Sequence, residues 1–391
     1  MPWTSVAPVD PLPGRRSGGA GAAVVAGDFE APGGFGGLGG STGTGSAGNP
    51  GSEFAPLLRT VREQGLLAHR TGWYALGITA NLLGITAVIT GMALLGGSWW
   101  VLLLAVPLAV FSARAGFYAH DAGHSQVAPD RRANRVIQLG HSNLLLGVSQ
   151  EWWNDKHNRH HANPNHTEKD PDVAADVLVF TQGQAAGRGR LTRHQAWLFF
   201  PLTTLEAIVL KVHGARAVIS RNGPCRSVRA RAVEGALLLA HTLGYAALLL
   251  TTMPPGRALV FGALHQMLLG LHLGMAFAPN HKGMAMPDPR SAQRWGHLRR
   301  QVLTSRNIRR GALTDWFLGG LNYQIEHHLF PSMPRPHLRL AQPLVRAHCR
   351  ALSVPYTETG FAESYRQALA HLHEVGEPLR ADRARGTARG A

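Results

Sequence analysis

Four long stretches of the chain are almost entirely apolar, and each is long enough to cross a lipid bilayer. A membrane-spanning helix needs about 20 residues, and the pattern predicts such helices at about 72–95, 98–118, 234–252 and 257–278. Buried core helices of a soluble protein would have the same composition. Short connections pair the first segment with the second and the third with the fourth, which favours two transmembrane hairpins. The predicted fold class is therefore all-α and integral to a membrane.

Two further apolar segments, about 136–148 and 196–212, are interrupted by polar residues such as His141, Glu206 and Lys211. This mixture predicts helices that lie at the membrane interface and do not span it. Residues 1–52 are rich in Gly, Ala, Pro and Ser, a composition that cannot bury enough apolar surface to fold. We therefore expect a disordered N-terminal tail, a folded domain over 53–376 and a loose basic tail over 377–391.

The net charge indicates which partners the chain would bind. The chain has 39 Lys and Arg against 23 Asp and Glu, giving a formal net charge of +16. Such an excess is typical of proteins that bind nucleic acid or an anionic membrane. Neither a zinc-finger cysteine spacing nor a long basic run occurs, so we expect membrane lipid and no nucleic acid as a partner.

The basic residues are also unevenly placed. Five precede the first hairpin, 15 lie between the hairpins and 17 follow the second. Because cationic loops stay on the cytoplasmic side, both chain ends, the middle loop and the active site are predicted to be cytoplasmic. The high Gly, Ala and Arg content fits a GC-rich bacterial genome and hence a bacterial plasma membrane.

Histidine is the unusual residue, with 21 in the chain, many of them in clusters. His residues four apart follow the second predicted span, and two later clusters have three- and four-residue spacing that places imidazoles on one helical face. A single His follows the fourth span. The eight residues predicted as metal ligands, and as the catalytic set, are His120, His124, His157, His160, His161, His281, His327 and His328.

Imidazole suits iron, zinc and copper, whereas the thiolates of iron–sulfur clusters are missing because the chain has only two cysteines. Two first-row metals with open positions need about eight ligands, which is the number found. Neighbouring carboxylates are expected to accept imidazole N–H bonds and so orient the ligands. They are Asp121, Asp155, Asp170, Asp172 and Glu326.

Other histidines are interpreted differently. His241, His265 and His272 fall within predicted spans, where they are expected to form hydrogen bonds between helices and not to bind metal. His141 and His166 are left out of the metal set, the latter as a neighbour of the ligands. Both cysteines, Cys225 and Cys349, are expected to be packing residues.

The joint pattern of the three histidine clusters resembles the membrane fatty-acid desaturase superfamily. Pro164–His166 with Asp170–Asp172, and the string Tyr323–Pro331, are similar to its acyl-lipid and front-end branch. The resemblance covers roughly 57–365. It implies a four-span helical fold whose cytoplasmic cap holds a non-haem di-iron centre bound by the histidines above. It also implies that O₂ and two electrons introduce a double bond into an acyl-CoA or acyl-lipid substrate.

Two departures from the family pattern matter. Gln324 stands where the third cluster has His in other branches, and we expect it to form a hydrogen bond near the site without binding metal. No His-Pro-Gly-Gly haem motif of a fused cytochrome b5 domain occurs. A separate electron donor is therefore implied, either a ferredoxin or a cytochrome b5-type protein with its NAD(P)H reductase.

Two alternative functions stay open at this point. A membrane di-iron hydroxylase or ketolase acting on another lipid or hydrocarbon would use the same clusters, because it also begins by hydrogen abstraction. A membrane metal transporter would instead be expected to place its histidines within the spans. Here the clusters follow or flank the spans, which disfavours transport.

Overall fold

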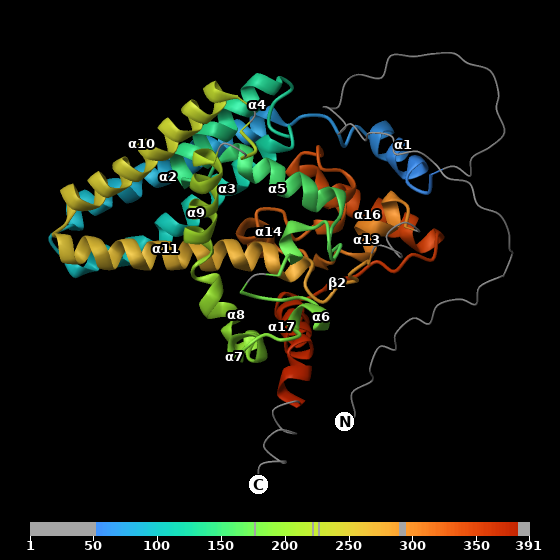
Figure 1. The fold of residues 1–391 in the computed structure, drawn as a ribbon. Helices are drawn as coiled ribbons and strands as arrows, with labels where there is room; N and C mark the ends of the chain where they lie inside the picture. Colours follow the sequence, from blue (N-terminus) through green and yellow to red (C-terminus); the bar gives the residue numbers. More distant parts are fainter. Residues whose placement is uncertain (1–51, 176, 221–222, 226, 289–294, 382–391) are drawn as a thin grey trace, which may run out of the picture. The chain divides into compact units, whose positions relative to one another are not determined.

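The computed structural model describes residues 52–381, apart from 176, 221–222, 226 and 289–294 (Figure 1). Nearly all of the predicted N-terminal tail lies outside the described residues. The first half of the fold comprises α1 (Ala55–Glu63), α2 (Thr71–Leu95), η1 (Trp99–Leu104), α3 (Ala105–Gly123), α4 (Arg131–Gln138), the π-helix η2 (Leu139–Leu146), α5 (Gln150–Ala162), η3 (Pro171–Val173), α6 (Gln182–Ala185), α7 (Arg190–Arg193), α8 (Gln195–Thr203) and α9 (Glu206–Ile219). The second half comprises α10 (Val228–Thr252), α11 (Pro255–Phe277), η4 (Ala278–Asn280), α13 (His297–Leu303), β1 (Asn307–Ile308), α14 (Ala312–Phe317), α15 (Gln324–Leu329), α16 (Arg335–Ala351), β2 (Glu358–Thr359) and α17 (Phe361–Val375).

All four predicted spans are long apolar helices, which confirms that part of the sequence prediction. They are α2, η1 with α3, α10, and α11 with η4, and α3 packs closely against α11. Only 17% of the apolar window of α2 and 11% of that of α10 is buried, against 44% for the other two. The inner pair α3 and α11 therefore forms the packed centre, while α2 and α10 expose apolar side chains as lipid-facing helices do.

The third span begins earlier than predicted, at Val228, because Ser227 caps the helix by accepting a hydrogen bond from the backbone N–H of Ala230. At the opposite end of this helix the turns after α2 and α10 meet. A side chain on Gly96 would collide with the carbonyl oxygen of Thr252, so only glycine permits this approach. Arg257 donates a hydrogen bond to the carbonyl of Gly96 and lies over the ring of Trp99.

The two segments predicted to lie at the interface are helical but broken. Residues 136–148 form the end of α4 and the π-helix η2, which stops at Gly147 in the left-handed region (φ 78°). Residues 196–212 form α8 and most of the first half of α9, which meet at a bend of 71°. Together α8 and α9 are apolar enough for one broken span, so their placement at the interface stays a prediction.

The C-terminal part forms a cap of short helices around α15. In Figure 1 the long helices α2, α10 and α11 occupy one side of the view, and α13 and α16 the other. The guanidinium of fully buried Arg306 ties this cap to the end of the fourth span by donating to the carbonyl oxygens of Pro279 and Lys282. The two strands pair in parallel, Asn307 opposite Glu358.

The structure describes the first part of the segment predicted as a loose C-terminal tail. Residues 377–381 continue as a helical turn. Arg380 fastens this turn by donating hydrogen bonds to the carbonyl oxygens of Arg193, at 3.0 Å, and His373. Only residues 382–391 of the predicted loose tail lie outside the described residues.

Candidate metal centre

Four separate segments bring the predicted histidines together. The end of α3 carries the first cluster, α5 the second and α15 the third, while His281 follows η4 directly. Their nitrogens form two groups, in each of which the potential ligand atoms lie within 4.8 Å of one another. The five-histidine group contains His120, His124, His157, His161 and His327, and the three-histidine group contains His160, His281 and His328. The two groups together contain every predicted ligand.

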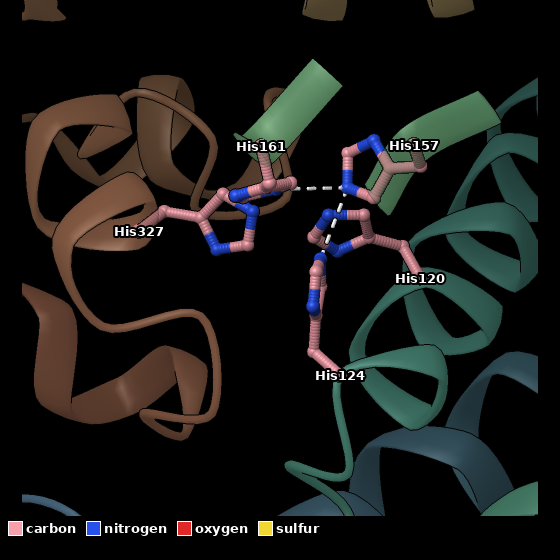
Figure 2. Close-up of side chains that lie close together, drawn as sticks. All are labelled: His120, His124, His157, His161 and His327. Carbon is pink, nitrogen blue, oxygen red and sulfur yellow. Dashed lines mark hydrogen bonds between the residues drawn. The ribbon is translucent and has the colours of Figure 1, made fainter. Parts of the chain in front are cut away.

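The rings of the five-histidine group converge on a common point (Figure 2). The Nε2 atom of His157 lies 3.0 Å from that of His124 and 3.1 Å from that of His161. Among the described residues, the buried Nε2 atoms of His120 and His327 have no hydrogen-bond partner. A neutral imidazole offers one donor and one acceptor, so several buried nitrogens aimed at one point satisfy one another poorly. They fit a bound cation much better, and an all-imidazole donor set suits iron, zinc or copper.

In the three-histidine group every ring is fixed by a hydrogen bond from its Nδ1. His160 donates to Asp170 Oδ2 at 2.9 Å, His281 to the carbonyl oxygen of Thr304 at 3.0 Å, and His328 to Gln301 Oε1 at 2.9 Å. Such bonds select the tautomer with an unprotonated Nε2, the atom that would bind metal. The residues Thr304 and Gln301 were missed by the sequence analysis, because neither type nor spacing marks them.

The carboxylates predicted to orient the ligands are only partly correct. Asp121 accepts from His120 Nδ1 at 3.0 Å, and Asp170 and Asp172 both lie against His160. Glu326 instead accepts hydrogen bonds from Asn307 and Tyr356, and Asp155 pairs with Arg159 at the surface. The prediction for Glu326 and Asp155 is therefore wrong: their partners come from outside the histidine site.

Burial sets the protonation of the site. It lowers the pKa of six imidazoles well below the usual value of 6.5, and the neighbouring histidines lower it further; these six are His124, His157, His161, His281, His327 and His328. Metal binding requires neutral imidazole. At neutral pH these rings are therefore already in the form that binds a cation.

Gln324 lies beside the three-histidine group. Its Nε2 donates to the Nε2 of His281 at 2.9 Å, and its Oε1 faces the side-chain amide of Asn280 at 3.4 Å. The amide thus forms a hydrogen bond at the edge of the site, in agreement with the sequence prediction.

The histidines inside the spans lie in neither group. His265 is hydrogen-bonded to Tyr245 of α10 at 2.8 Å, His272 donates to the carbonyl of Phe317, and His241 to that of Leu144. Each bond joins two different segments, as predicted. His141 and His166 are held by local bonds, to the carbonyl of Ile137 and from the backbone N–H of Glu168.

An apolar cavity adjoins the five-histidine group. It comprises about 410 Å³ of space between atoms, part of it open to solvent, and is bounded by α3, η2, α5, α9 and α11. Its walls include Gly116, His120, Leu146, Trp153, Leu210 and Leu273. His120 therefore belongs both to the metal group and to the cavity wall.

The comparisons with known proteins identify the family of this chain. The family model described as fatty acid desaturase matches residues 97–360, which is more than half of the 391-residue chain. The chain belongs to the fatty acid desaturase family. All eight histidines lie within the matched segment, and membership together with four long apolar helices makes the chain an integral membrane protein.

Three relatives show how far the similarity extends. An acyl-lipid (9-3)-desaturase of Physcomitrium patens is 29% identical over 71% of this chain and 54% of its own length. A Delta(6)-fatty-acid desaturase of Caenorhabditis elegans is 29% identical over 84% of this chain and 76% of its own. A Delta(8)-fatty-acid desaturase of Arabidopsis thaliana is 28% identical over 72% and 65%. The chain thus spans about half of the moss protein, just under two thirds of the plant protein and about three quarters of the nematode protein.

Proposed function

We propose that this desaturase-family chain is a fatty-acyl desaturase that uses two irons, O₂ and two electrons to introduce a double bond into an acyl chain. One observation carries the proposal: two groups of converging imidazoles lie side by side, and one of them borders an apolar cavity between the spans through His120. The names of the relatives support the same reaction class. When bound, the irons would supply the oxidising power to remove hydrogen from an unactivated methylene, which amino-acid side chains lack.

The chain's own residues would hold and orient the metal. We assign one iron to the five-histidine group and the other to the three-histidine group. Asp121 and Asp170 would keep the imidazoles they face in the ligating tautomer, with Nδ1 protonated and Nε2 free. Because the rings are buried and neutral, no proton has to be displaced from six of them when metal enters at neutral pH.

The cavity would bind the acyl chain. Its walls of Leu, Trp and Phe side chains favour a methylene chain over water. His120 belongs both to the cavity wall and to the five-histidine group, so an acyl chain that fills the cavity would pass beside this group. The carbon held there would be the one that reacts, because positioning decides which C–H bond is in reach. The moss relative's name favours an acyl-lipid carrier over acyl-CoA.

The proposed topology is two hairpins with the helical cap and both chain ends in the cytoplasm. The distribution of 39 basic residues supports this orientation, and the contact between the turn after α2 and the end of α10 supports placing both hairpin turns on the same side. An electron carrier, a ferredoxin or a cytochrome b5-type protein, would dock on the cytoplasmic face. Composition favours a bacterial plasma membrane, although the three relatives are from a moss, a nematode and a plant.

The deciding experiment is fatty-acid analysis of cells that express the chain with a compatible electron donor. Gas chromatography–mass spectrometry with double-bond localisation should find a new unsaturated acid that disappears in His160→Ala. His337→Ala is the matched control, because His337 is equally buried but donates to the carbonyl of Leu66, outside both groups. A hydroxy acid as product would replace this proposal with the hydroxylase function. Full activity and iron content in His160→Ala would overturn the assignment of the site.

A further inference from the structure

A buried carboxylate inside α10 takes part in none of the chemistry described so far. Glu234 is 1% exposed although it lies in a membrane-spanning helix. It accepts hydrogen bonds from the hydroxyl of Ser149 at 2.5 Å, from the side-chain amide of Asn143 at 3.2 Å and from the backbone N–H of Glu151 at 2.9 Å. An ionisable group within a span is costly to bury and is a functional hypothesis by default.

Two of these bonds lead directly to the beginning of α5, and the third leads there through Asn143 of η2. The first N–H groups of a helix have no partner within the helix and must be satisfied from outside. Here the N–H of Gln150 donates to Asn143, that of Glu151 to Glu234 and that of Trp152 to Ser149. A negative charge at this position also interacts favourably with the helix dipole. Glu234 is thus the centre of a side-chain cap that fixes the start of α5 to α10.

Helix α5 supplies three of the eight predicted ligands and contributes to both metal groups, as α15 also does through His327 and His328. His157 and His161 belong to the five-histidine group and His160 to the three-histidine group. His157 follows Glu151 by six residues, or about 9 Å along the helix. A tilt at the capped end would therefore displace all three imidazoles together. Trp153, one turn from the cap, also lines the cavity.

The same carboxylate holds the segment that precedes α5. Asn143 lies in the π-helix η2, and the neighbouring Ser142 bonds to the carbonyl of Val148 at 2.8 Å. This closes the turn through Gly147, whose neighbours Leu146 and Val148 line the cavity. Glu234 therefore connects one span to both a wall of the cavity and the helix of the second histidine cluster.

We propose that Glu234 is a positioning residue for the metal centre: it sets the angle of α5 and so places His157, His160 and His161 in both groups at once. The inference rests on the proposed metal site and adds a residue that binds no metal itself. Removing its carboxylate is expected to weaken iron binding by about tenfold or more, as loss of groups that orient ligands commonly does.

The test compares iron per chain and iron dissociation rate in the purified full-length protein, measured by mass spectrometry of the metal. Glu234→Ala removes all three bonds. Tyr245→Phe is the matched control, because it removes a partly buried polar bond of the same helix, to His265, which does not contact the start of α5. Visible spectra after loading with Co²⁺ in place of iron report whether the ligand geometry has changed.

A second pair of variants tests the bond pattern and does not depend on Glu234→Ala folding well. Glu234→Gln places an amide N–H₂ against the amide N–H₂ of Asn143, so two donors face each other. Adding Asn143→Asp restores a donor opposite an acceptor and returns the carboxylate charge to the cluster. The double variant should therefore recover iron affinity that the single variant lacks, at least severalfold.

The outcomes separate this inference from the proposal it rests on. Wild-type protein that binds no iron would overturn the proposed function itself. Wild-type protein with two irons, together with full iron in Glu234→Ala, would overturn the positioning role. Equal losses of bound iron in Glu234→Ala and Tyr245→Phe would overturn the positioning role as well. So would a double variant that recovers no iron affinity. Iron loss confined to the Glu234 variants and reversed by Asn143→Asp would establish it.

Discussion

The two histidine groups differ in how their rings are held and in what they face. In the three-histidine group each Nδ1 donates to a fixed acceptor, and among the described residues none of these rings lines the cavity. In the five-histidine group His120 borders the cavity, and two of the imidazoles belong to α3, the inner span. The three-histidine group is oriented in advance by its surroundings, whereas the five-histidine group is in contact with the space proposed for the substrate.

This difference suggests a division of labour on one helical scaffold. A group whose rings are fixed before metal arrives would bind its iron with little rearrangement. A group that adjoins an apolar cavity must also control which atom approaches it. The shared helix α5 couples the two, because consecutive residues His160 and His161 serve different groups.

The largest expected effect comes from removing one ligand from each group. The rings of His161 and His328 stack with centroids 4.3 Å apart, yet they belong to different groups. We predict that His161→Ala and His328→Ala each lose one of two irons and lower desaturation by at least about a hundredfold, more than is usual for loss of an orienting group. Iron per chain and fatty-acid analysis measure both effects. Loss of both irons in either variant would show that the division into two groups is wrong.

The next largest effect concerns orientation. Asp170 accepts hydrogen bonds from His160 and from the backbone N–H of Asn165, so Asp170→Asn should misplace one ring of the three-histidine group. Iron affinity at one of the two sites should fall by about 10–100-fold. Asp155→Asn is the matched control, because that carboxylate lies on the same helix as His160 but pairs with Arg159 at its surface. If both variants bound iron equally well, Asp170 would have no orienting role.

The sequence predicted the features that are local. Apolar runs identified the four spans. Histidine spacing identified seven members of the two groups, and the position of His281 after the fourth span identified the eighth. It could not predict which carboxylates face the rings: Asp121 and Glu326 each adjoin a histidine, but Asn307 and Tyr356 turn Glu326 away. Residues next to each other on a helix point about 100° apart. Contacts with other segments therefore decide which carboxylate faces an imidazole. The division into groups is likewise a property of the fold.

The stability of the iron-free protein should depend on pH, and more through the five-histidine group. Four of the six imidazoles with a strongly lowered pKa belong to it. In the unfolded chain these rings bind protons near pH 6.5, whereas in the folded protein they do so only at much lower pH. The unfolded state thus binds more protons below pH 6.5, and stability falls as pH falls.

The free energy of unfolding should fall by up to about 1.4 kcal/mol per histidine for each pH unit below 6.5. Thermal unfolding in detergent between pH 7.5 and 5.5 measures it. Replacing His124 and His161 with Gln should reduce the pH dependence more than replacing His281 alone. Equal slopes in the wild-type protein and the His124→Gln, His161→Gln variant would mean that these rings are protonated in the folded protein.

The smallest effect should come from the cavity wall and should leave both metal groups intact. A methyl group on Gly116 would lie 3.3 Å from Leu146 and 3.8 Å from Leu273, so Gly116→Ala narrows the cavity slightly. Because a methylene in an apolar pocket changes discrimination by about 1–3 kcal/mol at most, we expect a severalfold loss with the longest acyl chains and little with shorter ones. Gly244→Ala in α10 is the control, since a side chain there meets no atom within 4 Å. This control separates the effect of narrowing the cavity from the gain in stability of about 0.5–1 kcal/mol that replacing Gly by Ala brings to any helix interior. Iron content should be unchanged in both, and a change of chain-length preference in Gly116→Ala alone would place the substrate in this cavity, beside His120 and the five-histidine group.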